Sequence, residues 1–366
     1  MSRRQTYLDW NATAPLRPEA AAAIADALLL VGNPSSVHRA GRAARQVVER
    51  SREAVAASVD ASADSIVFTS GGTEANHLAL LGIGRPRVLV SAIEHSSVLH
   101  AVPDAERIPV DGDGVVDLAA LAALLDADPR PALVSVMLAN NETGVIQPVR
   151  AIAESAHARG ALFHCDAVQA AGKISLSLTA TGADLLTLSA HKIGGPAGIG
   201  ALVSAGAEVT PLLRGGGQER NRRAGTENLA GIAGFAGAAT VCDPSEYDRV
   251  STLRDRLEAS LPHALIIAAG AERLPNTSAV AMPGVPSETQ IIAFDLDGVM
   301  VSAGAACSSG KVGPSHVLAA MGLGPELAQS TLRVSLGWST TTADIDHFID
   351  AWSALYRRTR ARAKAA

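Results

Sequence analysis

The chain has few cysteines, few aromatic residues and no long apolar run, and each shortage excludes a class of protein. Its 366 residues include three cysteines without a CxxC pair, so neither a disulfide framework nor a metal site is expected. The longest small-apolar run, LAGIAGFAGAATVC, is too short to cross a bilayer and predicts a buried helix. Aromatic residues make up only 3% of the chain, so we expect a core of small and aliphatic side chains whose elements approach closely.

The sequence also lacks an excess of positive charge and an apolar leader. The formal net charge is -5 at pH 7, which argues against nucleic acid as a partner because phosphate binding needs a basic surface. The opening residues MSRRQTYLDW contain no apolar stretch, so we expect no signal peptide and a cytoplasmic protein away from membranes. A basic run starts at Arg357 and is typical of an exposed helix end, or alternatively of a tail that docks on an acidic partner.

Short apolar runs alternate with helical patterns over residues 64–204. The runs SIVFTS, RVLVSA, LVSVMLA, ALFHCDA, DLLTLSA and GALVSA are typical of parallel strands buried on both faces. The alternation predicts an α/β fold in which helices flank a mainly parallel sheet. The length favours two domains. A break at 242–250 predicts a large domain over 14–245 and a smaller domain formed by 1–13 and 246–366.

Polar residues follow most of the predicted strands. Ligands of open parallel sheets bind at the carboxyl ends of the strands, so these residues are expected to meet at one edge. Each group alone is weak evidence, because a tight turn, a buried structural ion pair or a satisfied core histidine explains it equally well. Their joint position indicates a binding site. The groups are Ser70–Thr73, Glu94 with His95, Asn140–Glu142, Asp166 with Gln169, and His191 with Lys192.

Three of these groups point to one chemistry. The glycines before Thr73 leave backbone N–H groups open to an anion at a helix start, although a capped turn explains them as well. Lys192 follows an apolar strand, and a desolvated lysine amine is the nucleophile that forms Schiff bases. Asp166 suits a protonated ring nitrogen. Together with a ring-stacking His95, these residues fit pyridoxal 5′-phosphate.

Ten blocks occur in the order of a known family: YLDWNATAP, GNPSSVH, TSGGTEANHLAL, EHSSVL, NNETGVIQP, HCDAVQAAGK, SAHKIGGPAGIGAL, GGGQERNRRAGTEN, SAGAACSSGKVGPSHVL and TLRVSLG. With them the chain resembles the cysteine desulfurases, the NifS/IscS-like members of the class V aminotransferase family. The resemblance runs almost end to end. It implies a fold-type I, pyridoxal phosphate-dependent transferase with a large domain around a mainly parallel sheet and a smaller α+β domain.

The resemblance also implies roles for single residues. Lys192 would form the Schiff base, His95 would stack on the cofactor ring and move protons, and Asp166 would pair with the ring nitrogen. Arg333 would bind the substrate carboxylate, a task that suits a planar and permanently charged guanidinium. The remaining implied contacts are Gln169 and Asn141 near the ring hydroxyl, Asn141 also near the substrate, and Gly72, Thr73, Ser189, His191 and Thr226 at the phosphate, the last donated by the second subunit of a homodimer.

Cys307 is the implied nucleophile. It lies in a run of serine, alanine and glycine without periodicity, which predicts a flexible loop, whereas Cys165 and Cys242 belong to apolar segments. The resemblance implies that L-cysteine yields L-alanine and a persulfide on Cys307. The sulfur would then pass to a scaffold protein for iron–sulfur cluster assembly or to another thiolation reaction.

Three alternatives stay open at this stage. A class V aminotransferase would share Lys192, Asp166 and Arg333 but would not need Cys307, and a selenocysteine lyase would use nearly the same residues. A non-catalytic sulfur carrier on the same fold would not need an intact Lys192 and His95. The chain departs from the usual family pattern at Ala14, at the edge of the substrate pocket, and at 312–313, close to Cys307.

Overall fold

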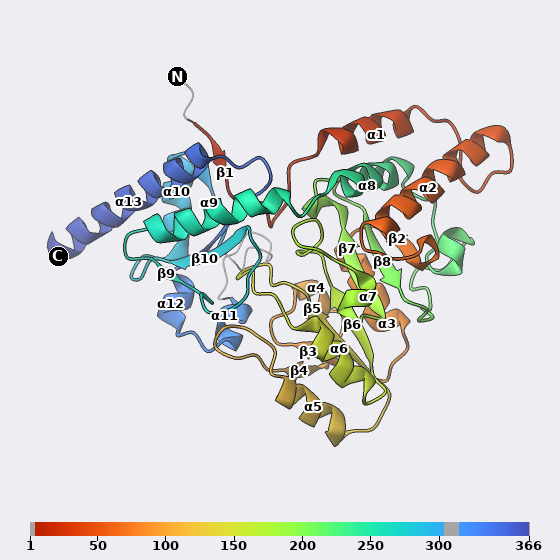
Figure 1. Cartoon of the computed structure of the whole chain (residues 1–366), viewed down its shortest axis with the longest axis horizontal. Coiled ribbons are helices and arrows are strands. Elements are labelled where there is room, and N and C mark those ends of the chain that lie inside the picture. The colour runs from red at the N-terminus through yellow and green to blue at the C-terminus, as the bar shows by residue number, and fades with distance from the viewer. Residues whose placement is uncertain (1–3, 304–314, 366) are drawn as a thin grey trace.

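The computed structural model describes residues 4–303 and 315–365, with side chains up to residue 361. Its largest sheet has seven strands, and two smaller sheets lie beside it (Figure 1). In spatial order, the large sheet contains β2 (Ile66–Thr69), β8 (Gly200–Ser204), β7 (Leu185–Ser189), β6 (Leu162–Asp166), β5 (Ala132–Met137), β3 (Arg87–Ser91) and β4 (Glu106–Ile108).

The six strands predicted from apolar runs all form, and the sheet is mainly parallel as predicted. Strand β8 is the exception, because it runs antiparallel to both β7 and β2. The connection from β7 to β8 consists of residues 190–199. It is too short for a helical crossover, so the chain turns back and β8 runs antiparallel. Strand β4 was not predicted. It has three residues, carries Glu106 and Arg107, and lies at the sheet edge, where an apolar pattern is not required.

Helices cover both faces of this sheet, and strand side chains alternate between two cores. Phe68, Phe163 and Leu186 belong to the first core, whereas Val67 and Leu133 belong to the second. The first core is covered by α1 (Pro18–Leu28), α2 (Arg39–Ala57), α5 (Leu118–Ala127), α6 (Val149–His157), α7 (Leu178–Thr181) and α8 (Leu229–Val241), and the second by α3 (Gly72–Gly82) and α4 (Ser96–Leu99).

The predicted buried helix is α8, which α1 covers at very short range (Figure 1). A Cβ atom at Gly234 would lie 2.6 Å from Ile24 Cγ1, and one at Gly237 would lie 2.8 Å from the Glu19 backbone oxygen. Side chains larger than glycine would therefore push the two helices apart. The expected close approach of elements with small residues is confirmed at this contact.

The two ends of the chain share a second region. Strand β1 (Thr6–Tyr7) pairs with β11 (Val299–Met300), and β10 (Thr277–Ala281) lies between β9 (Leu265–Ile266) and β12 (Thr331–Ser335). The core of this region contains three packed aromatic side chains, Phe294, Phe348 and Trp352. Its helices are α9 (Glu246–Ser260), α10 (Ser287–Leu296), α11 (His316–Ala320), α12 (Pro325–Gln329) and α13 (Thr342–Ala365).

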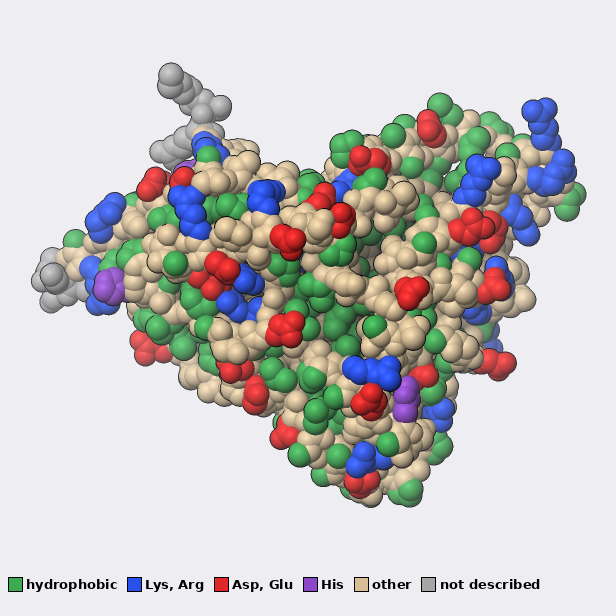
Figure 2. All heavy atoms as spheres, viewed as in Figure 1, with side chains coloured by type: hydrophobic (Ala, Val, Ile, Leu, Met, Phe, Trp, Pro, Cys, Tyr) green, Lys and Arg blue, Asp and Glu red, His purple; other side chains and the backbone are tan. Residues whose placement is uncertain are grey.

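The domain boundary at residue 245 stays a prediction, although β1 does join the C-terminal part of the chain as that prediction requires. Over the described ranges, no helix combines the length and the apolarity that a bilayer crossing demands. Figure 2 shows acidic and basic side chains interspersed over this face of the molecule.

Candidate active site

The predicted polar groups lie at one edge of the large sheet. Strands β7, β6, β5 and β3 are parallel, and β2 has the same direction because β8 is antiparallel to both β2 and β7. The carboxyl ends of these five strands therefore share an edge, which we call the rim. The N-terminal segment reaches the rim as well, since the Ala14 backbone N–H donates to the His191 oxygen at 2.9 Å.

Lys192 lies directly after β7, in the 3-10 helix η2 (Ala190–Lys192). Its Nζ donates to the backbone oxygens of Asn11 at 2.6 Å and Ala12 at 2.9 Å. The side chain is half-buried, which is more exposed than the apolar strand before it suggested. The amine is thus held by carbonyl groups at a partly open position, where another molecule can reach it.

Asp166 ends β6, and the residue is 5% exposed. Its Oδ2 accepts a hydrogen bond from Asn76 Nδ2 at 2.8 Å, and its Oδ1 accepts one from the Val168 backbone N–H at 3.0 Å. Both donors are uncharged. A buried carboxylate with neutral donors gains most from a cationic partner, so this position suits a protonated ring nitrogen.

His95 caps the short helix α4, where its Nδ1 accepts from the Ser97 backbone N–H at 3.1 Å and contacts Ser97 Oγ at 2.8 Å. Ser97 Oγ also accepts from Asn76 Nδ2 at 2.9 Å, so one amide connects His95 with Asp166. Burial lowers the pKa of His95, against the opposing effect of Asp166, and the charge of Lys192 lowers it further. The imidazole is therefore neutral near pH 7, and because its Nδ1 accepts from the Ser97 N–H, its proton lies on Nε2.

The predicted anion site lies at the start of α3. Gly71 has a φ of 153°, and nothing lies within 4 Å of the position that its Cβ would occupy. A Cβ at Gly72 would lie 3.1 Å from Val168 Cγ2 and 3.5 Å from Ser189 Cβ, so this turn packs beside the end of β7. The first N–H groups of α3 have no partner within the helix, and they favour an anion together with the helix dipole.

His191 and Thr73 lie near this helix start with different surroundings. Burial and the charge of Lys192 lower the pKa of His191 to about 4, so a neutral imidazole is present there at physiological pH. His191 Nδ1 lies 3.3 Å from Thr13 Oγ1, whereas the Thr73 side chain is exposed. A phosphate at this position would therefore meet hydrogen-bond donors and the helix dipole.

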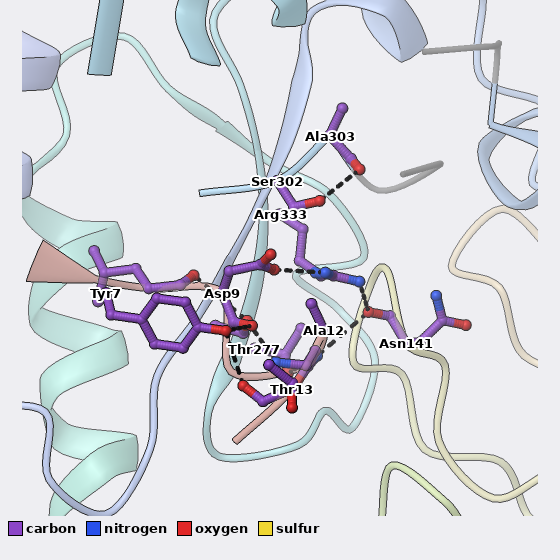
Figure 3. A network of polar contacts seen from close by, with 12 residues as sticks. Tyr7, Asp9, Ala12, Thr13, Asn141, Thr277, Ser302, Ala303 and Arg333 are labelled. Carbon is purple, nitrogen blue, oxygen red and sulfur yellow. Dashed lines mark hydrogen bonds and ion pairs between the residues drawn. The ribbon is translucent and has the colours of Figure 1, made fainter. Parts of the chain in front are cut away.

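Arg333 on β12 is buried and points toward the N-terminal segment (Figure 3). Its Nη2 donates to Asp9 Oδ1 at 2.6 Å, and its Nη1 donates to the Asn141 backbone oxygen at 3.0 Å. The Asn141 side chain points away from the guanidinium (Figure 3). The predicted carboxylate-binding arginine thus already has an anionic neighbour, Asp9, which the sequence analysis did not identify.

Asn11 lies at the centre of the contacts between Lys192 and the rest of the rim. Its backbone oxygen accepts from Lys192 Nζ and from Gln169 Nε2 at 3.0 Å. Its side-chain Oδ1 accepts from Lys173 Nζ at 2.9 Å, and its Nδ2 donates to the Asn141 backbone oxygen at 3.3 Å. One buried asparagine therefore joins two lysines to the two amide residues predicted near the cofactor hydroxyl.

The sequence analysis assigned no role to Asn11, Asn76, Lys173 or Asp9. Each of them lies inside or at the edge of a quoted block and is a polar residue among apolar neighbours, which was the available signal. Thr226 is exposed and lines a surface hollow with Ser70, Gly198 and Arg223. Cys307 and positions 312–313 lie outside the described residues.

Comparison with known proteins assigns the chain to a family. The family model described as "Aminotransferase class-V" matches residues 6–348. The chain belongs to the aminotransferase class-V family. A curated relative, a "Cysteine desulfurase" from Cereibacter sphaeroides, is 45% identical to this chain. The alignment has a length of 377 residues with gaps and covers 98% of this chain and 97% of the relative. A "Cysteine desulfurase IscS" from Dictyoglomus turgidum is 38% identical, with 98% and 96% covered.

Solved structures agree with this class-V assignment. The crystal structure of a NifS-like protein from Rickettsia africae has a TM-score of 0.90 and 37% identity, covering 97% of this chain and 100% of that chain. A second structure titled "NIFS-LIKE PROTEIN" has a TM-score of 0.89 and 34% identity, covering 96% and 99%. The predicted fold class is therefore confirmed.

Class-V aminotransferases use pyridoxal 5′-phosphate, and the rim fits this cofactor. Three observations support the fit: an amine on Lys192 that carbonyl groups hold at a partly open position, a buried carboxylate on Asp166 with neutral donors, and an open helix start at Gly71. They correspond to the aldehyde, the ring nitrogen and the phosphate of the cofactor. His95 lies within electrostatic reach of both Lys192 and Asp166, as a residue beside the ring would.

Proposed function

We propose that this protein is a cysteine desulfurase that converts L-cysteine to L-alanine and transfers the sulfur to Cys307. The observation that carries the proposal is the meeting of Lys192, Asp166 and His95 at one rim, in a chain whose full-length relatives bear that activity in their names. An amine, a buried carboxylate and a neutral imidazole form a set that abstracts and returns protons beside a bound ring.

The bound cofactor supplies an electron sink for the negative charge that develops on the substrate α-carbon. The residues of the chain do the rest. Arg333 binds the substrate carboxylate, Asp166 holds the ring nitrogen protonated, and Gln169 and Asn141 lie near the ring hydroxyl. Lys192 accepts and returns the α-proton, and His95, neutral near pH 7 with its proton on Nε2, acts as a proton donor beside the ring. The groups that would contact the phosphate are Gly72, Thr73, Ser189, His191 and Thr226.

The segment that carries Cys307 starts and ends beside this rim, which supports its role. Before it, Ser302 and Arg333 exchange backbone hydrogen bonds of 3.3 and 2.7 Å. After it, Ser315 Oγ donates to Glu142 Oε2 at 2.6 Å, and His316 Nε2 lies 2.9 Å from the Glu94 backbone oxygen.

From that segment the Cys307 thiolate would attack the substrate sulfur. A sulfur–sulfur bond then forms while the carbon–sulfur bond breaks. The released electron pair stays with the carbon, and protonation of that carbon completes alanine.

The test uses the purified, cofactor-loaded protein with L-cysteine and a thiol reductant. We expect sulfide and alanine in equal amounts from the wild type, and almost none from Cys307→Ala, although that variant should keep the yellow colour of the bound cofactor. Cys242→Ala is the matched control and should turn over normally, since Cys242 ends α8. Normal turnover by Cys307→Ala would refute the assignment, and transamination without sulfide would indicate an ordinary class-V aminotransferase.

We propose further that the active form is a homodimer in which Thr226 reaches the phosphate of the other subunit. The Ala224 backbone N–H donates to the Leu213 oxygen at 3.1 Å, so the exposed Leu212 and Leu213 lie beside the segment that carries Thr226. Exposed large apolar side chains of this kind are typical of a subunit interface. Further large apolar side chains that are exposed include Leu28, Leu29, Val31 and Val37.

The sulfur acceptor and the cellular setting belong to the same proposal. We place the enzyme in the cytoplasm, where it would hand sulfur to a scaffold protein of iron–sulfur cluster assembly. Parallel assays with L-cysteine and L-selenocysteine separate a desulfurase from a selenocysteine lyase, because both would use the same residues. A higher kcat/KM for L-selenocysteine would overturn the substrate assignment while leaving the cofactor chemistry intact.

A further inference from the structure

A second lysine, Lys173, lies behind the rim and has no role in the reaction as described so far. It follows β6 by seven residues and is 3% exposed. Its Nζ donates to Asn11 Oδ1 at 2.9 Å and to Gln169 Oε1 at 2.9 Å. Lysine is rarely buried unless it is paired, and both of these acceptors are uncharged amide oxygens, so its retention here requires a reason.

The charged groups around Lys173 do not include a carboxylate that could form an ion pair with it in the described part of the chain. Burial lowers the pKa of Lys173 well below its usual value, and the charges of Lys192 and Arg333 lower it further, with only Cys242 acting in the opposite direction. Lys173 is thus an electrostatic neighbour of Lys192, and Asn11 contacts the amines of both. The stabilising contribution of Lys173 must come from the groups that it orients.

Lys173 decides which way the Gln169 amide points. Lys173 Nζ donates one hydrogen bond to Gln169 Oε1 and one to Asn11 Oδ1, and even an uncharged amine has the two N–H groups that these bonds need, so the oxygen of each amide faces the lysine. With Oε1 of Gln169 directed at Lys173, its Nε2 is directed the other way and donates to the Asn11 backbone oxygen at 3.0 Å. An amide without this lysine could rotate and present its oxygen in place of its nitrogen.

The same reasoning holds for Asn11. Its Oδ1 accepts from Lys173 and from Asn276 Nδ2 at 3.1 Å. Its Nδ2 therefore donates to Thr277 Oγ1 at 2.9 Å and to the Asn141 backbone oxygen. These contacts hold the Asn11 backbone oxygen where Lys192 Nζ donates to it.

We propose that Lys173 is a positioning residue of the active site, which fixes the amide orientations of Asn11 and Gln169 and thereby the place of the Lys192 amine and the donor that Gln169 offers to the cofactor hydroxyl. The inference rests on the proposed function, because it assigns Gln169 to that hydroxyl. A methionine at 173 would fill similar volume without any donor, so it separates the hydrogen bonds from the packing.

The experiment compares the wild type with Lys173→Met, both loaded with pyridoxal 5′-phosphate. We measure the visible absorption band of the bound cofactor as a function of pH, the cofactor dissociation constant and the melting temperature. The expected result is a shifted pH midpoint of the band and a dissociation constant raised about tenfold or more. A purely structural lysine would lower the melting temperature and leave the band and the dissociation constant as in the wild type, and that result would overturn the proposal.

Two further variants test the route through Gln169. Asn276→Ala removes the other donor to Asn11 Oδ1 but leaves Lys173 bonded to both amides, so it should shift the band less than Lys173→Met. Gln169→Leu should reproduce the shift, and adding Lys173→Met to it should change the band little further. A wild-type band in Gln169→Leu would overturn the proposal even if Lys173→Met did not fold.

The outcomes also separate this inference from the proposed function. A wild-type protein that binds no pyridoxal 5′-phosphate refutes the proposed function before Lys173 is tested. A yellow, active wild type together with an unchanged Lys173→Met spectrum refutes only the role of Lys173.

Discussion

Arg333 Nη2 lies 2.6 Å from Asp9 Oδ1, so residues 324 positions apart form an ion pair at the rim. Arg333 Nη1 is held by the Asn141 backbone oxygen, while Nε is buried without a hydrogen-bond partner in the described part of the chain. Asp9 and Asn141 therefore fix the plane of the guanidinium. A guanidinium oriented in advance loses little freedom when it binds a carboxylate.

Arg333→Lys should weaken substrate binding. A lysine keeps the charge but loses the planar fork that Asp9 and Asn141 orient, so the substrate carboxylate is held by fewer bonds. We expect KM for L-cysteine to rise by about tenfold to a hundredfold, as for the loss of a hydrogen bond to a charged group. Steady-state kinetics measures this, and an unchanged KM would exclude Arg333 from carboxylate binding. Arg273→Lys, which alters a pair with Glu258 at 2.7 Å, is the control and should leave KM unchanged.

Asn76→Ala should disturb both ends of the connection between Asp166 and His95. The alanine removes the donor to Asp166 Oδ2 and the donor to Ser97 Oγ, leaving buried oxygens without those partners. We expect kcat to fall by about tenfold and the visible band of the bound cofactor to shift, because Asp166 is the proposed partner of its ring nitrogen. Gln290→Ala removes a buried amide outside the rim and is the matched control. It should lower stability only, and the same behaviour in Asn76→Ala would contradict the connection.

Glu94 makes stability depend on pH. Burial raises its pKa from 4.5 to about 8, although Ser91 and the Met137 backbone donate hydrogen bonds to it. Since the folded state binds this proton more tightly than the unfolded chain, the stability that it contributes is fully present below about pH 4.5 and is lost as the pH rises through about 8. Glu94→Gln keeps the neutral shape, so it should melt above the wild type near pH 9 and close to it near pH 5.

Thermal denaturation of the holoenzyme at both pH values checks this expectation. The surface variant Glu154→Gln is the control, because Glu154 is exposed and its difference from the wild type should not change with pH. Equal melting temperatures of Glu94→Gln and wild type under alkaline conditions would show that ionisation of Glu94 does not destabilise the folded protein.

Subunit mixing tests whether Thr226 acts across the dimer. A purified heterodimer of Lys192→Ala and Thr226→Ala has one fully intact site if each site takes its threonine from the partner, so it should show about half of the wild-type activity. If Thr226 serves its own subunit, no site is intact, and the heterodimer should be no more active than the mean of the two mutant homodimers.

Much of the rim could be predicted from the sequence because its elements are local. Apolar runs marked six strands of the large sheet, and a shared strand direction was enough to bring Lys192, Asp166 and His95 to one edge. The resemblance of ten blocks then indicated the cofactor and the reaction. These inferences needed only the pattern of residues along the chain.

Other features depend on contacts between distant segments. The antiparallel direction of β8 follows from the short chain after β7, and apolarity alone does not show it. The half-buried state of Lys192 depends on the carbonyl groups of Asn11 and Ala12, which come from the N-terminal segment about 180 residues earlier. No local sequence pattern predicts the ion pair between Asp9 and Arg333. The two side chains meet only because β1 pairs with β11 in the C-terminal region.

The sequence by itself therefore determined six strands of the large sheet and the main chemical groups of the rim, because hydrophobic periodicity is a property of neighbouring residues. Only the tertiary structure decided how these groups are oriented. The amides of Asn11 and Asn76 take their directions from partners on other segments, and a hydrogen bond depends on distance and angle in space.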